Sequence, residues 1–257
     1  MIYIITVNFN DAINLKRTIA SVRKYKNDYQ RFIVIDGAST DDSLKIIQSN
    51  LDVIDDYLSE PDRGIYDAMN KVSYFNLHDS DFLIWINAGD ELIDWKSIID
   101  CNFLIKYDAA FYSVIAKTKP EHSGKIKIPY IYKPYDEKNF FPKSQYYHQG
   151  FIISYRFFKM NLYDTNIGIQ AENLLMSKTI IYGCIYSSPE PLSIYYLGGI
   201  SNTNYKNVIK SYFNVAKALD FNMTKFYLYK RRFILKLFIL RMLPQFILEK
   251  LKDKLYE

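Results

Sequence analysis

A short apolar run that ends in a carboxylate-bearing turn constrains this chain more than any other segment. Residues 82–86 read Phe-Leu-Ile-Trp-Ile, and the turn Asn87-Ala-Gly-Asp90 follows without a break. A run of this length and composition predicts a buried strand. In open α/β sheets, ligands bind just beyond the carboxyl ends of such strands, so Asp90 is expected at a ligand site. A lone carboxylate there suits a hard divalent cation that takes its other ligands from water and a diphosphate. A plain strand-to-turn connection is the alternative.

Strands and helices are expected to alternate through the first ninety residues. A helix is expected to begin at Asn10 or Asp11 and to reach about Lys24, and Ser39 and Asp42 have the spacing of a capping box for the next helix. Alternation of this kind is typical of an α/β fold whose central sheet is mostly parallel and flanked by helices. The apolar runs that predict its strands are 2–7, 32–35, 53–58 and 82–86.

The first of these helices is expected to bury one face, formed by Ile13, Ile19, Ala20 and Val22. Beyond Asp90 the pattern loosens, and the stretch 117–147 shows no clear period. The remaining predicted elements are helices over 65–75, 95–103 and 171–182, strands over 109–116, 150–154 and 192–196, and helical structure from 204 onward.

Two other predicted strands also end in polar turns. Asn8 follows the first strand, and Asp36-Gly-Ala-Ser39 follows the second. Because the carboxyl ends of parallel strands meet at one edge of a sheet, these residues are expected to line one crevice with Asp90. Asn8 and Asp36 could hydrogen-bond a nucleobase or ribose there, and the helix that begins near Ser39 could offer N–H groups to an anion. Ordinary turn and capping chemistry is the alternative for Asp36 and Ser39.

The segment 59–71 forms a second dense group of polar residues. Arg63 precedes Gly64 at a helix entry, where a guanidinium could meet a phosphate or a base. Asp67 follows four residues later, so the two side chains could instead pair on a charged surface helix. The chain has neither a P-loop nor a GxGxxG segment, which excludes the usual glycine-rich phosphate cradles.

Together these segments resemble the inverting family 2 glycosyltransferases with the GT-A fold, in particular the small bacterial enzymes of colanic-acid and capsule biosynthesis. The resemblance covers about residues 1–203, and its most specific part is the segment 59–71. It is carried by residues 6–8, 34–41, 59–71 and 82–90 and, in the second half, by His148-Gln149, Ala171-Glu172 and residues 197–201.

The resemblance implies donor-binding roles for several residues. Asp36 corresponds to the acidic residue that reads the uracil or ribose of a sugar nucleotide. His148 matches the family's His-Gln pair and could face the diphosphate or the acceptor, with a structural histidine as the alternative. The other residues that the resemblance assigns to the donor pocket are Thr6, Asn8, Ser39, Arg63, Asp67 and Asn87.

The resemblance also implies a metal ligand and a general base. Asp90 corresponds to the last carboxylate of the family's DxD segment, and Asn87 stands at the first carboxylate position. Binding of Mg²⁺ or Mn²⁺ would therefore rest on Asp90 and the diphosphate oxygens. The base that deprotonates the acceptor hydroxyl is implied to be Glu172, where many relatives have Asp. A first-turn carboxylate favoured by the helix dipole is the alternative, and Asp164 is the next candidate for the base.

Positive charge is concentrated at the end of the chain. The formal net charge is +5, and residues 225–257 contain nine Lys or Arg against three Asp or Glu, so the rest of the chain is nearly neutral. Aliphatic and aromatic residues accompany these charges. A basic amphipathic helical tail over 204–257 is therefore expected to lie on an anionic leaflet. Packing of the tail against the catalytic body is the alternative. No stretch of about 18 uncharged apolar residues occurs, so no spanning helix is expected.

The length of 257 residues suits one large domain or two closely packed halves. We expect a GT-A catalytic domain over 1–203, with a nucleotide-binding half over 1–95 and an acceptor half over 96–203. Cys101 and Cys184 are far apart, which argues against a disulfide framework and favours the reducing cytoplasm. The protein is expected to be peripheral on the inner face of the bacterial cell membrane.

The expected reaction moves a sugar, with inversion, from a nucleoside diphosphate sugar, with UDP favoured, to a hydroxyl of a growing cell-surface polysaccharide or lipid-linked glycan. Two rivals remain. A membrane-associated scaffold with a degenerate site is suggested by Asn87 and Glu172 at carboxylate positions. A sugar nucleotidylyltransferase would carry a glycine-rich basic first loop, which residues 6–10 lack. Nucleic acid is not an expected partner, because the basic residues are confined to an aliphatic-rich tail.

Overall fold

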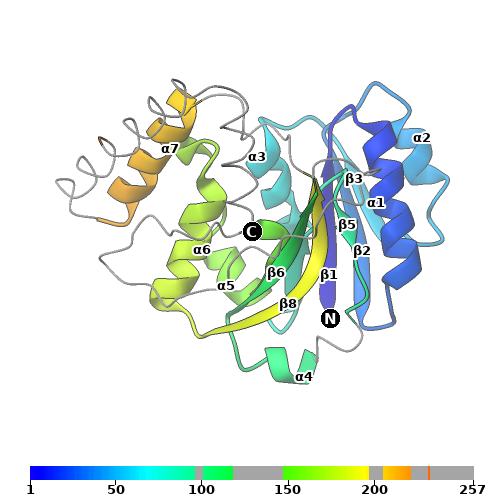
Figure 1. Cartoon of the computed structure of the whole chain (residues 1–257). Coiled ribbons are helices and arrows are strands. Elements are labelled where there is room, and N and C mark those ends of the chain that lie inside the picture. The colour runs from blue at the N-terminus through cyan, green and yellow to red at the C-terminus, as the bar shows by residue number, and fades with distance from the viewer. Residues whose placement is uncertain (96–100, 118–146, 197–204, 221–230, 232–257) are drawn as a thin grey trace, which may run out of the picture.

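The computed structural model describes residues 1–95, 101–117, 147–196, 205–220 and 231. Within these residues the strands form one eight-stranded sheet in the order β3-β2-β1-β4-β7-β6-β8-β5 (Figure 1). The strands are β1 (Ile2–Asn8), β2 (Gln30–Asp36), β3 (Asp56–Ser59), β4 (Phe82–Trp85), β5 (Glu91–Leu92), β6 (Ala109–Lys117), β7 (Phe151–Ser154) and β8 (Ile185–Tyr196).

The four strands β1–β4 run parallel, as their alternation with helices predicted. The strand β7 runs antiparallel to both β4 and β6, β8 runs parallel to β6, and β5 runs antiparallel to β8. The predicted α/β fold is therefore confirmed, with a mixed rather than uniformly parallel sheet. Because β7 pairs directly with β4, both halves of the chain contribute strands to one sheet.

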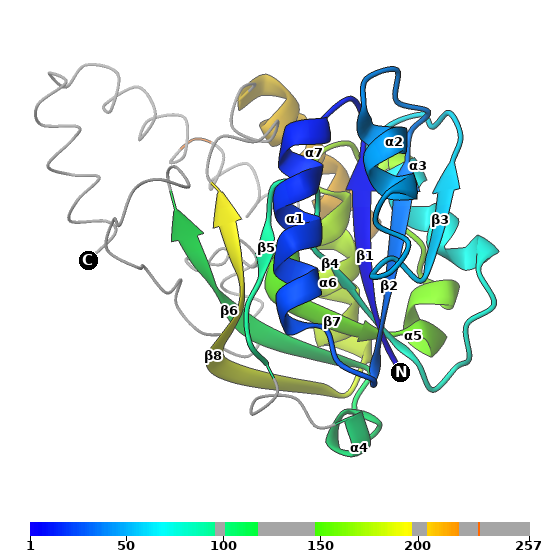
Figure 2. The same ribbon diagram turned by 90° about the vertical axis from the view of Figure 1, so that its right-hand side faces the viewer.

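Helices cover both faces of the sheet. Figure 2 shows α1 in front of the sheet and α6 behind it. The helices are α1 (Ala12–Tyr25), α2 (Ser43–Gln48), α3 (Ile65–Asn70), α4 (Cys101–Leu104), α5 (Tyr155–Met160), α6 (Ala171–Tyr182) and α7 (Tyr205–Ala218), with short 3₁₀ turns η1 (Lys71–Tyr74), η3 (His148–Gly150) and η4 (Thr165–Ile167).

Alternation along the strands divides the core into two layers. Ile4, Val34 and Ile84 pack with the apolar residues of α1 and α2. The neighbouring residues on the same strands face the opposite side, where they pack with residues of α3, α5, α6 and α7. The parallel strands are thus buried on both faces, which explains why their sequences read as continuous apolar runs.

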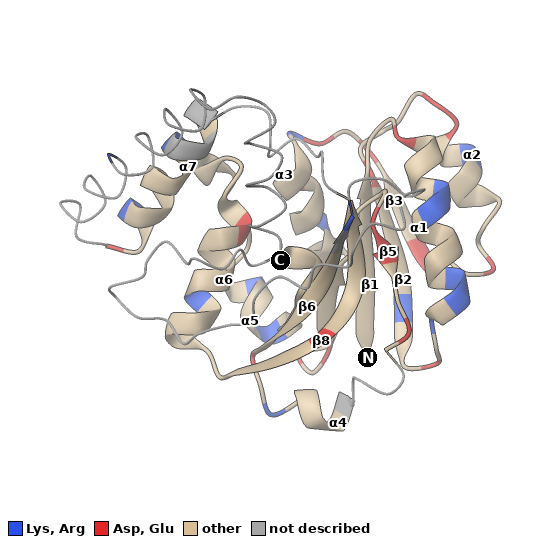
Figure 3. Ribbon diagram, in the orientation of Figure 1, with Lys and Arg blue, Asp and Glu red and all other residues tan. Residues whose placement is uncertain are grey.

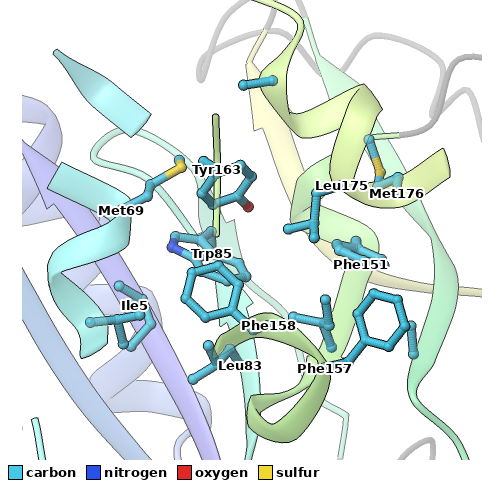
Figure 4. Close-up of a cluster of buried hydrophobic side chains, with 14 of the residues drawn as sticks. Ile5, Met69, Leu83, Trp85, Phe151, Phe157, Phe158, Tyr163, Leu175 and Met176 are labelled. Carbon is cyan, nitrogen blue, oxygen red and sulfur yellow. The ribbon is translucent and has the colours of Figure 1, made fainter. Parts of the chain in front are cut away.

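Trp85 forms the centre of the second layer (Figure 4). Its ring lies 5.1 Å from that of Phe158 and 5.5 Å from that of Tyr163, measured between centroids. Such tilted and edge-on aromatic pairs add to the stabilisation that burial alone provides. Trp85 is the last residue of β4, so this cluster fixes the strand from which the Asn87–Asp90 turn departs.

The predicted inner face of the first helix is partly wrong. Ile13 is 84% exposed and Ala20 is exposed, whereas Leu15, Ile19 and Val22 are buried. Leu15, Ile19 and Val22 follow the 3.6-residue period that one buried stripe requires, and Ile13 lies outside that stripe. The helix itself begins and ends close to its predicted bounds.

The predicted capping box is also wrong. The helix α2 begins at Ser43, and Asp42, the residue before it, makes no side-chain capping bond. Asp41 instead accepts a hydrogen bond from the Ser43 amide at 3.0 Å. The Ser39 hydroxyl instead donates a hydrogen bond to the Asp36 carboxylate, so Ser39 does not cap α2.

Several predicted segments lie wholly or partly outside the described residues. These are the end of the 95–103 helix, most of the loop 117–147, the turn 197–201 and the tail beyond 220 except residue 231. Among the described helices, none combines the length and apolar character needed to cross a bilayer.

Candidate active site

The carboxyl ends of β1, β2 and β3 meet in register at one edge of the sheet. Asn8 pairs with Asp36, and Asp36 pairs with Ser59. The Asp36 carboxylate is fully buried and accepts hydrogen bonds from Asn8 Nδ2 at 2.9 Å, from the Ser39 amide and hydroxyl, and from the Ser59 hydroxyl. The polar residues at these strand ends therefore gather around this carboxylate, whose oxygens accept hydrogen bonds from protein donors.

The loops after β1 and β2 are joined by further hydrogen bonds. Asn10 Oδ1 accepts from the Thr40 amide at 2.7 Å, and the Asn10 amide donates to the Ser39 hydroxyl at 2.8 Å. Asn10 and Ala38 both adopt left-handed backbone conformations, with φ of 49° and 60°. Non-glycine residues rarely adopt this conformation, so the surrounding bonds hold both loops in a preset shape.

Asn8 and Thr6 differ in what they offer to a ligand. Asn8 Oδ1 is a buried acceptor without a protein hydrogen-bond partner, so it is available to a donor group in the crevice. The Thr6 side chain is fully buried, and its hydroxyl donates to the Ile86 carbonyl at 2.6 Å. Thr6 thus ties β1 to the end of β4, while its predicted contact with the nucleoside stays a prediction.

The segment 59–71 packs against the crevice from the β3 side. A side-chain carbon at Gly37 would lie 2.4 Å from Asp62 Oδ2, so the Asp62 side chain would have to move to admit any other residue there. The Lys71 ammonium is buried beneath the turn and donates to the Pro61 carbonyl at 2.7 Å. The Arg63 side chain is 86% exposed and pairs with Asp67 at 2.9 Å, which leaves most of its surface open to a ligand.

The turn Asn87–Asp90 is held by two residues of α1 that the sequence did not single out. The Thr18 hydroxyl donates to the Asp90 carbonyl at 2.7 Å and accepts from the Gly89 amide at 2.9 Å. Arg17 donates to the Gly89 carbonyl through its Nε and Nη2 atoms. Figure 3 shows basic segments along α1 and acidic segments near the loops beside α2 and β3.

Asp90 is a carboxylate held out of water. Only 6% of the residue is exposed, and its Oδ2 atom accepts a hydrogen bond from Gln149 Nε2 at 2.8 Å. Burial raises the pKa of Asp90 to about 6, against the lowering effects of the Gln149 bond and the His148 charge. A carboxylate whose pKa is shifted in this way is common at functional sites.

Asp90 is also flanked by unpartnered acceptors. Asn87 Oδ1 and Gln149 Oε1 are buried and accept no hydrogen bond from the protein. Buried polar oxygens without partners are rare and call for a specific explanation. A hard cation with oxygen ligands would satisfy them. Within the part of the chain that the structure describes, however, no group of three His, Cys, Asp or Glu side chains could hold a metal by itself.

His148 links the turn to the predicted base. Its Nδ1 atom lies 2.8 Å from Glu172 Oε2, and its Nε2 atom lies 3.0 Å from Asn87 Nδ2. Burial alone would lower the pKa of His148, but the charge and hydrogen bond of Glu172, together with the Asp90 charge, raise it above the ordinary value. The structure therefore brings together three of the predicted residues, Asn87, His148 and Glu172, in one hydrogen-bonded chain beside Asp90.

Contacts between the two halves set the position of α6. The Tyr66 hydroxyl donates to the Ile169 carbonyl at 3.0 Å, just before this helix. Asn70 exchanges two hydrogen bonds with the backbone of Tyr163, each of 2.9 Å. Glu172 lies in the first turn of α6, where its carboxylate turns toward His148. Asp164, the alternative base, is exposed and bonds the Asn166 amide at 2.9 Å.

Comparisons with known proteins identify the family to which this chain is similar. The family model for Glycosyl transferase family 2 matches residues 3–157, more than half of the chain. An uncharacterised glycosyltransferase of Mycobacterium tuberculosis (strain ATCC 25618 / H37Rv) is 40% identical over 84 residues, which make up 32% of this chain and 30% of that protein. The chain therefore matches less than a third of that relative's length.

Solved structures share the fold at low sequence identity. TarS 1–349 of S. aureus in complex with UDP-GlcNAc has a TM-score of 0.64 and 12% identity, covering 84% of this chain and 65% of that one. The mannosyltransferase PcManGT of Pyrobaculum calidifontis, in complex with GDP-Man and Mn²⁺, has a TM-score of 0.59 and 11% identity, covering 84% and 64%. Because the family model matches more than half of the sequence, the chain belongs to glycosyl transferase family 2.

Proposed function

We propose that this protein transfers a sugar, with inversion, from a nucleoside diphosphate sugar to an acceptor hydroxyl, and that UDP is the nucleotide. The observation that carries the proposal is the connected site in which Asp90 and the His148–Glu172 pair lie together beside the crevice at the strand ends. TarS is similar in fold and was solved with UDP-GlcNAc, which supports a UDP-linked donor.

A divalent cation, Mg²⁺ or Mn²⁺, would be held chiefly by Asp90. The fit rests on the buried carboxylate and on the two neighbouring acceptor oxygens, Asn87 Oδ1 and Gln149 Oε1, that lack protein partners. When bound, such a cation neutralises charge that develops on the departing diphosphate. The mannosyltransferase that shares the fold was solved with Mn²⁺, which supports this cofactor class.

Glu172 serves as the general base in this proposal. Transfer with inversion is one displacement, so a single group must take the acceptor proton as its oxygen attacks the anomeric carbon. The remaining proposed donor contacts are the crevice residues Thr6, Asn8, Asp36, Ser39, Arg63 and Asp67. Of these, Asp36 acts by shaping the crevice through its bonds to Asn8, Ser39 and Ser59.

Donor binding can be tested with a panel of nucleotide sugars. We expect one UDP-sugar to raise the melting temperature of the full chain in the presence of Mn²⁺, and to do so less without the metal, because only the folded state binds. GDP- and dTDP-sugars are the controls. Stabilisation by no member of the panel would contradict donor binding, and equal stabilisation by all nucleotides would contradict the choice of UDP.

The acceptor is proposed to be a growing cell-surface polysaccharide or lipid-linked glycan of the capsule type, reached from the inner face of the membrane. The support is the composition of residues 225–257, where nine basic residues accompany many aliphatic and aromatic ones. Segments in which basic residues accompany aliphatic and aromatic ones are typical of contacts with anionic leaflets.

Membrane contact can be tested by flotation with vesicles. The full chain is expected to float with vesicles that contain phosphatidylglycerol and to be released by high salt, because screening weakens contacts between lysine and anionic lipid. Vesicles of phosphatidylcholine alone are the control. Failure to float with either kind would favour a tail that packs on the catalytic body.

A further inference from the structure

Asn87 lies in the turn that carries Asp90, the proposed metal ligand, and its side chain contacts a histidine. The Asn87 Nδ2 atom lies 3.0 Å from His148 Nε2, and His148 Nδ1 lies 2.8 Å from Glu172 Oε2. All three side chains are at least partly buried. The chain of contacts therefore runs from the end of β4, through the η3 turn, to the first turn of α6.

The Asn87 amide nitrogen and the Glu172 carboxylate set the direction of the two hydrogen bonds to His148. An amide nitrogen can only donate, so His148 Nε2 must accept the bond from Asn87. At a pH where the ring is neutral, its proton then lies on Nδ1 and is donated to the Glu172 carboxylate, since a neutral imidazole has one donor and one acceptor. A carboxylate at position 87 has no proton to offer and cannot make the first of these bonds.

We propose that Asn87 and His148 are positioning residues that hold the Glu172 carboxylate in place, and that residue 87 is an amide because Nε2 of His148 needs a donor. This inference rests on the proposed role of Glu172 as the base. It offers a reason for an amide at this position. The Asn87 nitrogen contacts the histidine that holds the base, while its Oδ1 atom makes no hydrogen bond to the protein.

Both ends of the chain of contacts are fixed to the body of the protein. The turn that carries Asn87 is anchored to α1 by the Thr18 hydroxyl, which donates to the Asp90 carbonyl at 2.7 Å, and by Arg17, which donates to the Gly89 carbonyl. The start of α6 is anchored through the Tyr66 bond to the Ile169 carbonyl. With both ends held, loss of the central bonds would let the Glu172 side chain rotate, and a misplacement of about 1 Å can lower a rate by about 100-fold.

The variant N87D separates this role from a metal-ligand role, because a carboxylate can still bind a cation but cannot donate a hydrogen bond to His148 Nε2. If Asn87 positions the base, N87D lowers kcat by about 10- to 100-fold at saturating Mn²⁺ and leaves KM for the donor unchanged. The control N76D adds the same charge at an exposed site near the amino-terminal end of β4 and is expected to act like wild type. An N87D variant that keeps its kcat at saturating Mn²⁺ would overturn the proposal.

The tautomer of His148 gives a readout that needs no substrate. In ¹⁵N-histidine-labelled protein at pH 8, we expect the His148 ring to carry its proton on Nδ1, and the signal to be assigned by its absence in H148Q. In an N87L variant this tautomer preference should weaken. A proton on Nε2, or on both nitrogens, in the wild-type protein would overturn the proposal. Absence of transfer by the wild-type chain would instead contradict the proposed function, and the tautomer would still be measurable.

Discussion

Replacement of Glu172 by Gln is expected to lower kcat by about 1,000-fold while KM for the donor stays within about two-fold of wild type. General base catalysis contributes about 10²- to 10⁴-fold, and an amide cannot take the acceptor proton. The Gln side chain has the same shape, and its Oε1 atom can still accept the hydrogen bond from His148 Nδ1. The structure and the donor pocket should therefore persist.

Steady-state kinetics and donor-induced stabilisation together check this prediction. The matched control is E190Q, which removes one carboxylate from an exposed position of β8 and should leave turnover unchanged. Normal turnover by E172Q would place the base elsewhere, with D164N as the next variant to measure. Loss of donor stabilisation together with turnover would indicate that Glu172 contributes to binding rather than to proton transfer.

Replacement of Asp90 by Asn is expected to remove activity and to stabilise the protein. Activity falls because the amide carries no charge with which to hold the cation and, through it, the diphosphate. Stability rises because Asn replaces a buried carboxylate whose pKa lies at about 6, above the ordinary value of 3.8. At pH 7.5 the gain in free energy of unfolding is about 3 kcal/mol, the energy that corresponds to that shift.

The sign of this effect depends on pH. The pKa of Asp90 is higher in the folded state, so its stabilising contribution is present below about pH 4 and is lost as the pH rises through about 6. D90N lacks this titration, so its advantage should vanish near pH 4. Urea unfolding without divalent metal, at pH 4.5 and 7.5, measures the difference. Equal stability of D90N and wild type at pH 7.5 would contradict a raised pKa of Asp90 in the folded protein.

The order and type of most elements could be predicted because the first half is built from βαβ units with distinct apolar runs. The strands that carry Asn8, Asp36 and the Asn87–Asp90 turn lie where the sequence placed them. The antiparallel insertion of β7 beside β4 could not be predicted, because the choice of partner depends on long-range contacts that no local pattern encodes.

The hydrogen bonds of the candidate site could not be predicted from the sequence. Arg17 and Thr18 escaped notice because, in sequence, they look like ordinary polar residues of a surface helix, and only the folded turn reveals their bonds to Gly89 and Asp90. Gln149 stood next to His148 in the segment that carries the family resemblance, yet its bond to Asp90 depends on the approach of η3 to the turn.

The contact between Glu172 and His148 could not be predicted from the sequence. Glu172 lies outside residues 3–157, the part that the family model matches, so its proposed role as the base is supported by its position and not by the match. In sequence it resembles any carboxylate in the first turn of a helix. Its 2.8 Å contact with His148 distinguishes it from a residue that merely complements the helix dipole.

Identification of the nucleotide product from the best-stabilising nucleotide sugar tests the central claim most directly. With Mn²⁺ and a bacterial glycan acceptor fraction, we expect the wild-type protein to release the nucleoside diphosphate as the sugar is transferred, and D90N to release none. Formation of a nucleoside triphosphate and a sugar phosphate on addition of pyrophosphate would instead reveal a nucleotidylyltransferase. Recovery of the bound donor intact under all conditions would contradict catalysis and leave a binding protein.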